Sequence, residues 1–261
     1  MIENHDKENW GCLYIATGGK YVRSALQSAD SVLCHTTDIG THLFTSINQL
    51  EVTTRQRVLN TFDSVQDIKS PHARSKVDYI RRSPFDRTLY LDSDTRVVSD
   101  IRDVFAVLDQ FDIALAHAHA RHNPRTQAIW RHDIPEAFPQ FNGGVIAYRD
   151  SGKVNRLLCD WASAYHKAGF TKDQVTLREL LWLSDLRIAT LPPEYNVRYS
   201  KYLYIWRQQE AIPKILHFNK FHDTFITRLK RQFLHITIAL LKQTGLYDLS
   251  KRLYHQIFNK R

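Results

Sequence analysis

Short apolar runs alternate with amphipathic helical segments between Cys12 and Phe218, and this alternation limits the fold more than any other feature. The pattern predicts strands at 12–17, 31–38, 88–92, 112–117, 141–148 and 213–218, and helices at 18–29, 70–85, 99–111, 150–169 and 173–185. Such an α/β order predicts a mainly parallel sheet with helices on both faces. Ligands bind beyond the carboxyl ends of the strands in sheets of this kind.

Local signals set several of the predicted helix boundaries. Pro71 follows Ser70 in the first turn of helix 70–85, where proline is tolerated. Ser99 or Asp100 is expected to cap helix 99–111, and Gly169 is expected to end helix 150–169.

The length of 261 residues allows one domain with an appended segment, and we expect a domain at 1–222 and a tail at 223–261. The polar start "MIENHDKENW" is unlike a secretory signal, and no apolar window reaches the ~18 residues of a membrane span. Cys12 and Cys34 lie in strand-like runs, and Cys159 stands apart from both. These observations predict reduced, buried thiols in a cytoplasmic protein without a zinc site.

Positive charge is concentrated at the end of the chain. The net charge is +9, and residues 201–261 hold 12 Lys and Arg against 3 Asp and Glu, whereas the first 200 residues hold 24 of each. A neutral body with a basic tail is therefore expected.

The tail has two apolar stripes at helical spacing, with basic residues largely beside them. The stripes are Ile226, Leu229, Phe233, Ile236 and Leu240, then Leu246, Leu249, Leu253 and Ile257. One interpretation is a pair of helices that pack on the body with solvated basic faces. The other is binding to an anionic membrane surface, with peripheral localisation on the inner membrane face.

Asp92 and Asp94 stand one residue apart at the end of the apolar run "TLYL". Side chains at i and i+2 of an extended chain point the same way, so both would converge in the ligand crevice. Two ionised carboxylates repel unless a cation lies between them, and their hard oxygens suit Mg²⁺ or Mn²⁺. The residues alone also allow an interpretation in which Asp92 ends the strand, Asp94 caps a turn and no metal binds.

Two other classes of phosphate-handling enzyme fit poorly. A haloacid-dehalogenase-type phosphatase also has a strand followed by Asp-x-Asp, but it expects Thr or Val where Arg96 stands. Its aspartate strand usually comes first in the fold, whereas two predicted strands precede Asp92. The nucleotidyltransferase signature Gly-Gly-x-Gly-Thr-Arg is absent, so activation of a sugar phosphate is not expected.

An ordered set of motifs resembles the nucleotide-sugar glycosyltransferases of the GT-A fold, and within them the glycosyltransferase family 8-like group. From about Leu13 to Lys220 the motifs are "IATGGKYVRSA", "SKVDYIRRSPFDRTLYLDSDTRV", "FNGGVIAYR", "DQVTL", "LPPEYNV" and "ILHF". The resemblance implies a Rossmann-like GT-A fold with a mixed, mainly parallel sheet. It also implies transfer of a hexosyl group from a nucleotide diphosphate sugar, with a UDP-sugar as the expected donor, and retention of configuration.

The resemblance also implies a set of metal ligands. Asp92 and Asp94 match the metal-binding Asp-x-Asp, and His217 of "ILHF" matches a third ligand from a late strand. A neutral imidazole can join two carboxylates on Mn²⁺, or Mg²⁺ can take the same place. Without the resemblance, His217 reads as a hydrogen-bonded histidine at a strand end.

Further positions match the part of the family's site that holds the nucleotide sugar. They are Ala16, Thr17, Tyr21, Lys76, Asp92, Ser93, Asn142, Gly143, Gly144 and Lys220. Tyr21 would stack on the base, and Lys76 would place a point charge near the diphosphate. Alone, Lys76 also reads as part of a solvated helix face beside Arg74, and 142–144 as a plain tight turn before a strand. Gly18-Gly19-Lys20 stands where the family usually has an acidic residue, and the Gly, Pro and Trp of the family's phosphate-lysine element are missing around Lys220.

Two groups of residues remain to be interpreted. Asp173 and Gln174 match the pair that lies against the transferred sugar and are expected to be catalytic; alone, they read as an ordinary first turn of a helix. His117, His119 and His122 lie at or just beyond the end of the strand at 112–117, and we expect acceptor-site or surface residues there rather than metal ligands.

Three functions stay open at this stage. The first is a metal-dependent glycosyltransferase that acts on a saccharide or lipid-linked glycan. The second is a non-catalytic nucleotide-sugar or glycan-binding protein of the same fold, against which the intact Asp92, Asp94 and His217 argue. The third is binding of nucleic acid through the basic tail; no zinc finger or RNP-type aromatic pattern supports it, so no nucleic-acid partner is expected.

Overall fold

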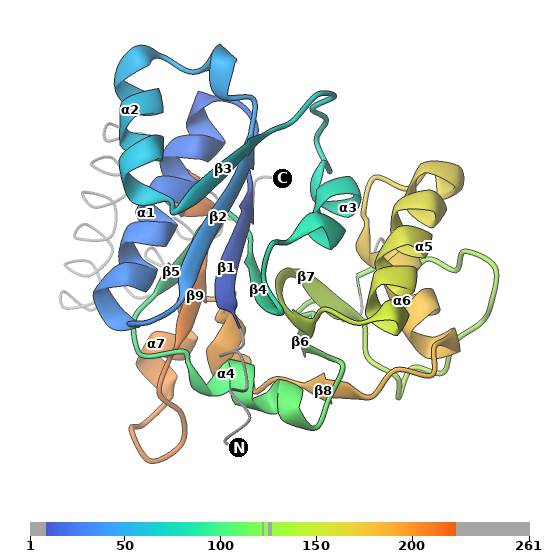
Figure 1. The fold of residues 1–261 in the computed structure, drawn as a ribbon. Helices are drawn as coiled ribbons and strands as arrows, with labels where there is room; N and C mark the ends of the chain where they lie inside the picture. Colours follow the sequence, from blue (N-terminus) through green and yellow to red (C-terminus); the bar gives the residue numbers. More distant parts are fainter. Residues whose placement is uncertain (1–8, 122, 125–126, 223–261) are drawn as a thin grey trace, which may run out of the picture. The chain divides into compact units, whose positions relative to one another are not determined.

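A seven-stranded mixed sheet forms the centre of the unit at 1–218 (Figure 1). The computed structural model describes residues 9–121, 123–124 and 127–222. In spatial order the strands are β3 (Ser64–Asp67), β2 (Gly40–Thr45), β1 (Trp10–Ile15), β4 (Arg87–Leu91), β7 (Phe141–Arg149), β6 (Ile113–His117) and β8 (Ile188–Thr190). The first four are parallel, β7 is antiparallel to both neighbours, and β6 and β8 are parallel. The mainly parallel α/β sheet is thus confirmed.

A second, two-stranded sheet pairs β5 (Thr95–Val97) antiparallel with β9 (Ile215–His217). The α-helices are α1 (Gly19–His35), α2 (Val52–Thr61), α3 (Lys76–Tyr79), α4 (Asp103–Ala106), α5 (Gly152–Ala168), α6 (Gln174–Leu183) and α7 (Tyr202–Ile205). Single turns of 3-10 helix are η1 (Ile47–Gln49), η2 (Ile80–Arg82), η3 (Val107–Asp109), η4 (Pro193–Asn196) and η5 (Asn219–His222).

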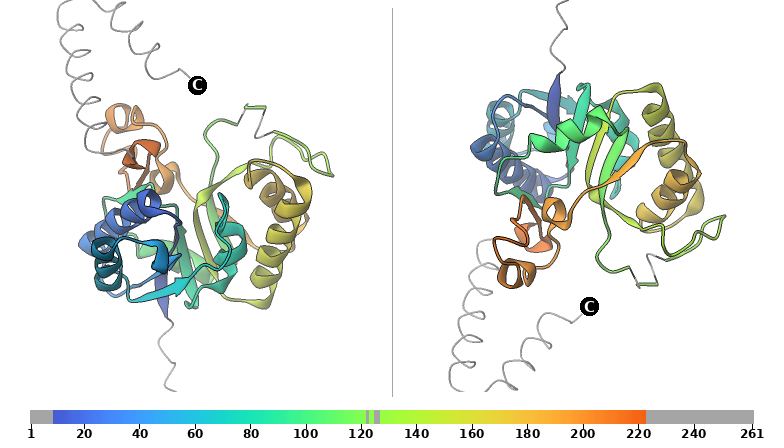
Figure 2. Two further views of the ribbon diagram at one scale, coloured as in Figure 1. Left: turned by 90° about the horizontal axis from the view of Figure 1, so that it is seen from above. Right: turned by 90° about the horizontal axis from the view of Figure 1, so that it is seen from below.

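The helices cover both faces of the seven-stranded sheet. In both views of Figure 2, α1 and α2 lie on one side of the sheet, and α5 and α6 lie on the other. The side chains of β4 explain this, because alternate residues of a strand point to opposite faces. Leu89 and Leu91 join the buried cluster under α1, α2 and α4, whereas Tyr90 joins the cluster under α3, α5 and α6. Leu89, Tyr90 and Leu91 are consecutive apolar residues because both faces of β4 are buried.

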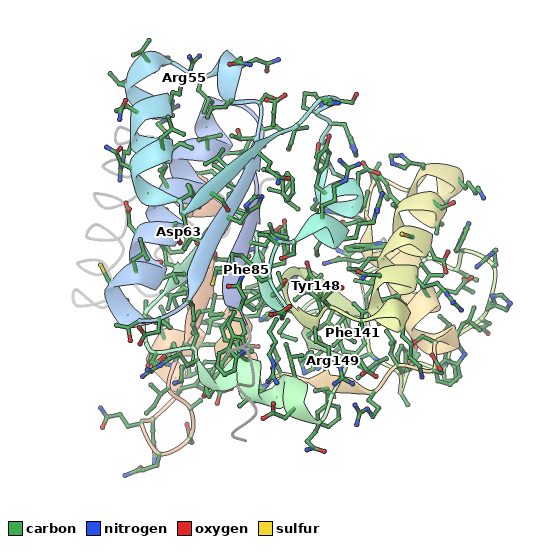
Figure 3. The ribbon with its side chains drawn as sticks, in the orientation of Figure 1. Arg55, Asp63, Phe85, Phe141, Tyr148 and Arg149 are labelled. Atoms are coloured by element: carbon green, nitrogen blue, oxygen red, sulfur yellow. The ribbon has the colours of Figure 1, made fainter. Side chains whose placement is uncertain are left out.

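Phe85, which is labelled in Figure 3, precedes β4 and packs against the beginning of β1 and β2. A Cβ atom on Gly11 would lie 2.3 Å from the Phe85 ring, and one on Gly40 would lie 2.6 Å from it. Glycine at the second position of β1 and the first position of β2 therefore makes room for the aromatic ring.

The strand predicted at 31–38 is wrong. Helix α1 continues to His35, because Val22, Leu26, Ala29 and Val32 keep one apolar face at spacings of three and four. Cys34 accordingly lies exposed on a helix, as does Cys159 on α5, and only Cys12 is buried. The strand that follows is β2.

The boundaries of two predicted helices also differ from those in the structure. Helix 70–85 is reduced to α3 and η2, because residues 72–75 form a turn of their own. In this turn the hydroxyl of Ser75 donates to the carbonyl of His72 and accepts a hydrogen bond from the N–H of His72. Helix 99–111 is reduced to α4 and η3. The predicted elements at 141–148, 150–169, 173–185 and 213–218 are present as β7, α5, α6 and β9, and Gly169 ends α5 at φ 68°. Strands β2, β3, β5 and β8 and helices α2 and α7 had no counterpart in the prediction.

The chain divides into compact units at 1–218 and 219–261, and of the second unit only η5 is described. The tail predicted at 223–261, with its basic and apolar stripes, lies outside the described residues. Within the part of the chain that is described, no helix has both the length and the apolar character needed to span a bilayer.

Candidate metal and donor-binding site

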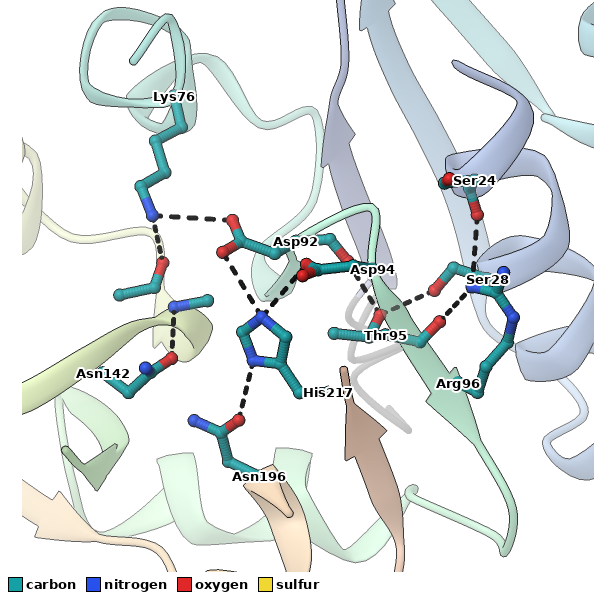
Figure 4. Close-up of polar contacts among 12 residues, drawn as sticks. Ser24, Ser28, Lys76, Asp92, Asp94, Thr95, Arg96, Asn142, Asn196 and His217 are labelled. Atoms are coloured by element: carbon teal, nitrogen blue, oxygen red, sulfur yellow. Dashed lines mark hydrogen bonds and ion pairs between the residues drawn. The ribbon is translucent and has the colours of Figure 1, made fainter. Parts of the chain in front are cut away.

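Asp92 and Asp94 lie in the turn between β4 and β5 (Figure 4). The turn is fixed by Thr95, whose N–H and hydroxyl both donate to the carbonyl of Asp92, at 3.1 and 2.9 Å. The N–H of Asp92 donates to the carbonyl of Gly144 on β7 at 2.8 Å. Asp94 is buried and Asp92 is partly exposed, so the turn presents one carboxylate to the interior and one to an open edge.

His217 reaches this turn through the small sheet, whose register places it opposite Thr95. Its Nε2 lies 3.1 Å from Asp94 Oδ1 and 3.7 Å from Asp92 Oδ2 (Figure 4). One ligand atom from each of the three residues lies within 4.8 Å of the other two. Two carboxylates and an imidazole therefore converge on one point, although His217 is 123 residues from Asp94 in the chain.

Asn196 orients the imidazole from the other side. Its Oδ1 lies 2.8 Å from His217 Nδ1, and both side chains are buried. When Nδ1 carries the proton and donates it to Asn196, the lone pair of Nε2 faces the carboxylates, as a metal ligand requires. The donor set of carboxylate oxygens and one imidazole nitrogen suits Mn²⁺ or Mg²⁺.

The absence of a side chain at Gly144 leaves room for the side chains of His217 and Asp92. A Cβ atom on Gly144 would lie 2.2 Å from His217 Cε1 and 2.6 Å from Asp92 Oδ2. No residue with a side chain fits there without moving one of these two groups.

Lys76 lies beside the cluster on its other flank. Its Nζ donates to the carbonyl of Gly143 at 2.7 Å and lies 3.0 Å from Asp173 Oδ2 and 3.5 Å from Asp92 Oδ1. The hydroxyl of Tyr90 donates to the same oxygen of Asp92 at 2.7 Å. Burial opposes the charged form of Lys76, but the carboxylates of Asp173 and Asp92 outweigh it and raise its pKa.

Asp173 precedes the first turn of α6 and is almost wholly buried. Its carbonyl accepts from Trp161 Nε1 at 2.9 Å, and its Oδ1 lies 3.7 Å from Arg74 Nε. Burial alone would raise the pKa of Asp173, but the positive charges of Lys76 and Arg74 prevail and lower it. The carboxylate is therefore ionised and paired.

The turn at 142–144 lies between these groups. Asn142 Oδ1 accepts from the N–H of Gly144 at 3.0 Å. A Cβ atom on Gly143 would lie 3.2 Å from Lys76 Nζ, 3.3 Å from Asp173 Oδ2 and 3.8 Å from Gln174 Cγ. The structure thus brings together the predicted Asp92, Asp94, His217, Lys76, Asn142, Gly143, Gly144, Asp173 and Gln174.

The remaining predicted residues are placed less directly. Ala16 and Thr17 follow β1, which is parallel to β4, so their loop begins at the same end of the sheet as Asp92. Tyr21 is about half exposed in the first turn of α1. Ser93 is partly buried between the two aspartates, and Lys220 lies in η5, where its side chain falls outside the described part of the structure.

Three residues around the site had no predicted role in it. Tyr90 is two residues before Asp92 on the same strand, so the period of two could have indicated their contact. Arg74 reads as a solvated residue in the sequence but contacts Asp173. Asn196 stands in the quoted motif "LPPEYNV", and nothing local in that motif indicates its bond to His217.

No family model matches the sequence, and a search of curated proteins finds no match. Among solved structures, apo mouse xyloside xylosyltransferase 1 is similar with a TM-score of 0.56 and 17% identity, over 83% of this chain and 99% of that chain. Galactosyltransferase LgtC, in complex with donor and acceptor sugar analogues, has a TM-score of 0.56 and 12% identity, over 80% of this chain and 87% of that chain.

The glycosyltransferase GlyE of Streptococcus pneumoniae TIGR4 has a TM-score of 0.52 and 19% identity, over 80% of this chain and 55% of that chain. The fold of this protein is therefore the Rossmann-like GT-A fold of glycosyltransferases. At these identities the similarity concerns the fold alone.

Proposed function

We propose that this protein is a metal-dependent glycosyltransferase that moves a sugar from a nucleoside diphosphate sugar to a hydroxyl of a saccharide or lipid-linked glycan. One observation carries the proposal: Asp92, Asp94 and His217 converge at the carboxyl end of β4 in a GT-A fold, beside the paired Lys76 and Asp173. Ligands of parallel sheets bind at this end of the strands.

The convergent donor set supports a divalent cation held by Asp92, Asp94 and His217, with Mn²⁺ or Mg²⁺ as the matching ions. When bound, the cation offsets the negative charge that grows on a diphosphate leaving group. Lys76 would add a second positive charge next to it. Because three oxygen acceptors surround its Nζ, the ammonium is held in place before the donor arrives.

The reaction exchanges one bond of the anomeric carbon for another. The bond to the diphosphate oxygen breaks and its electron pair stays with the nucleoside diphosphate. The acceptor oxygen bonds to the anomeric carbon, and the hydroxyl proton is released to solvent. Asp173 and Gln174 lie next to Gly143, where their oxygens would face the positive charge that develops on the sugar ring.

The finer identity of the reaction rests on the family 8-like resemblance. It supports a UDP-sugar donor, hexosyl transfer and retention of configuration. A proton NMR spectrum of the first product formed would test the last point, because the coupling of the anomeric proton distinguishes retention from inversion.

A screen of nucleotide sugars tests the proposal. Purified protein with Mn²⁺ is offered UDP-, GDP- and CMP-linked sugars, and release of the free nucleotide is measured with and without EDTA. Release that depends on metal and is lost in Asp94→Asn supports the proposal. Asp160→Asn, which changes an exposed carboxylate of α5, is the matched control and is expected to behave like the wild type.

Two results would contradict the proposal. Nucleotide release that is equal with and without EDTA would exclude the metal-dependent mechanism. Binding of a nucleotide sugar without any release, across a broad panel of acceptors, would favour the non-catalytic binding protein instead.

A further inference from the structure

A pocket of about 200 Å³ lies directly beside the candidate metal site. It is lined by Ala116, His117, His119, Arg121, Leu191, Pro193, Asn196, Tyr202 and Trp206. Asn196 belongs to both places, because its Oδ1 contacts His217 and its side chain also lines the pocket. A molecule in this pocket would therefore lie one side chain away from the proposed cation.

Two buried N–H groups of the lining have no acceptor. The N–H of Arg198 donates to Nε2 of His119 at 3.3 Å, so the proton of the neutral imidazole is on Nδ1. That Nδ1 is buried and has no hydrogen-bond partner among the residues the structure describes. The same holds for Nδ2 of Asn196, since its Oδ1 is taken by His217. Buried donors without acceptors are costly, and a ligand that supplies acceptors would satisfy them.

The pocket lining contains a positively charged side chain and no negatively charged one. Arg121 lines it and has no ion-pair partner within 9–121, 123–124 and 127–222, and the lining contains no acidic side chain. Lys201 Nζ lies 5.5 Å from the ring centre of Tyr202. Burial, together with the positive charges of Arg198 and Arg121, lowers the pKa of His119 to about 4, so His119 is a neutral donor at neutral pH.

One wall of the pocket is aromatic. Tyr202 and Trp206 stack with ring centres 4.9 Å apart and an angle of 12° between the ring planes. Such a flat apolar surface packs well against the C–H face of a sugar ring, while polar groups at its edge bind the ring substituents. Hydrogen-bond donors, one guanidinium and an aromatic surface thus share one small space.

We propose that this pocket receives the acceptor and that the acceptor is an anionic saccharide, whose carboxylate or phosphate is bound by Arg121, His119 and Asn196. The inference rests on the proposed function and names its acceptor class. An oxyanion offers several lone pairs and no donor, which matches a set made only of donors. A neutral hydroxyl would satisfy one or two of these groups and would leave the charge of Arg121 uncompensated.

Calorimetric titration of the full-length protein tests the inference. The probes are glucose, glucuronate and glucose 6-phosphate, in EDTA so that no cation contributes. We expect at least one anionic sugar to bind about 10-fold or more tightly than glucose, because a charged hydrogen bond is worth more than a neutral one. Whether glucuronate or glucose 6-phosphate binds better identifies the anion as a carboxylate or a phosphate.

Arg121→Ala is expected to weaken binding of the anionic sugar by about 10- to 100-fold and to leave that of glucose unchanged. Arg81→Ala, which removes an exposed arginine of η2 outside the pocket lining, is the matched control and should bind like the wild type. Equal binding of all three sugars, binding of none of them, or equal effects of the two variants would overturn the inference. Nucleotide release is measured separately with Mn²⁺, so failure of the donor reaction would be recognised as a different result.

Discussion

Gly144→Ala tests the geometry of the proposed metal site with one added methyl group. The new Cβ would lie 2.2 Å from His217 Cε1, whereas ordinary contacts begin at 3.4 Å. The imidazole or strand β7 must therefore move by about 1 Å, while metal–ligand distances tolerate about 0.2 Å. We expect the Mn²⁺ affinity to fall by at least about 10- to 100-fold, the loss typical of disturbed metal shells.

Two further glycines provide a graded comparison. A Cβ on Gly143 would meet Lys76 Nζ at 3.2 Å and Asp173 Oδ2 at 3.3 Å, contacts that relax by a few tenths of an ångström. Gly143→Ala should therefore affect the metal less than Gly144→Ala does. Gly152 in the first turn of α5 has nothing within 4 Å, so Gly152→Ala should leave metal binding unchanged and should stabilise the fold by up to about 1 kcal/mol.

Mn²⁺ is titrated into each variant, and the concentration of the free ion is measured by electron paramagnetic resonance. Thermal unfolding in EDTA is the control for folding. Overpacking at Gly144 is expected to cost about 1–3 kcal/mol of stability, so the variant should unfold a few degrees earlier but remain folded at 25 °C. A Mn²⁺ midpoint within twofold of the wild type in a folded Gly144→Ala protein would refute the assignment of this cluster as the metal site.

Further predictions concern the ligands, the ion pair and the tail. His217→Ala should raise the Mn²⁺ midpoint about 10-fold or more; an unchanged midpoint would place the third ligand elsewhere. Lys76→Met should destabilise the protein by up to about 3–5 kcal/mol, because it leaves the buried Asp173 with only the more distant Arg74 as a counter-charge, and Lys76→Met with Asp173→Asn should recover part of this. The pKa of Asp173 is lowered and that of Lys76 is raised. The stabilisation by the pair is therefore lost only as pH falls through the lowered pKa of Asp173 or rises through the raised pKa of Lys76. The contribution of the pair to the wild-type Tm should accordingly be constant from about pH 5 to 9, whereas the difference in Tm from Lys76→Met should shrink as pH falls, because burial raises the pKa of Asp173 once Lys76 is removed. Full-length protein should sediment with anionic liposomes at low salt and a 1–222 fragment should not; equal behaviour would argue against a membrane role for 223–261.

The strands that carry the site could be predicted because both of their faces are buried. Three consecutive residues of the run "TLYL", Leu89, Tyr90 and Leu91, are apolar, and much of β6 and β7 is apolar too, as is typical of central strands. The period of two then puts Asp92 and Asp94 on the same side of an extended chain. The resemblance of the ordered motifs to the family 8-like group indicated His217, Lys76 and Asp173 as further site residues, although they lie far apart in the sequence.

Strand β2 shows why other parts could not be predicted. It is "GTHLFT", and the polar residues Thr41, His42 and Thr45 are all buried in it. Thr41 is satisfied by Asp63, which accepts from its N–H and its hydroxyl at 2.7 and 2.9 Å, and His42 contacts Ser64. These partners follow about 22 residues later, so a local window sees only a polar segment. Tertiary contacts of this kind also explain the unpredicted role of Asn196.

The small sheet of β5 and β9 sets the geometry of the proposed metal site. Strand β5 begins one residue after Asp94, and its register opposes Thr95 to His217 and Val97 to Ile215. Val97 and Ile215 are both buried, and a slip of one residue would turn each strand's side chains to the opposite face. His217 would then point away from the aspartates, and Leu216 would take its place. The same apolar contacts that stabilise the sheet therefore hold His217, the proposed third ligand, within reach of Asp94, from which it is separated by 123 positions in the chain.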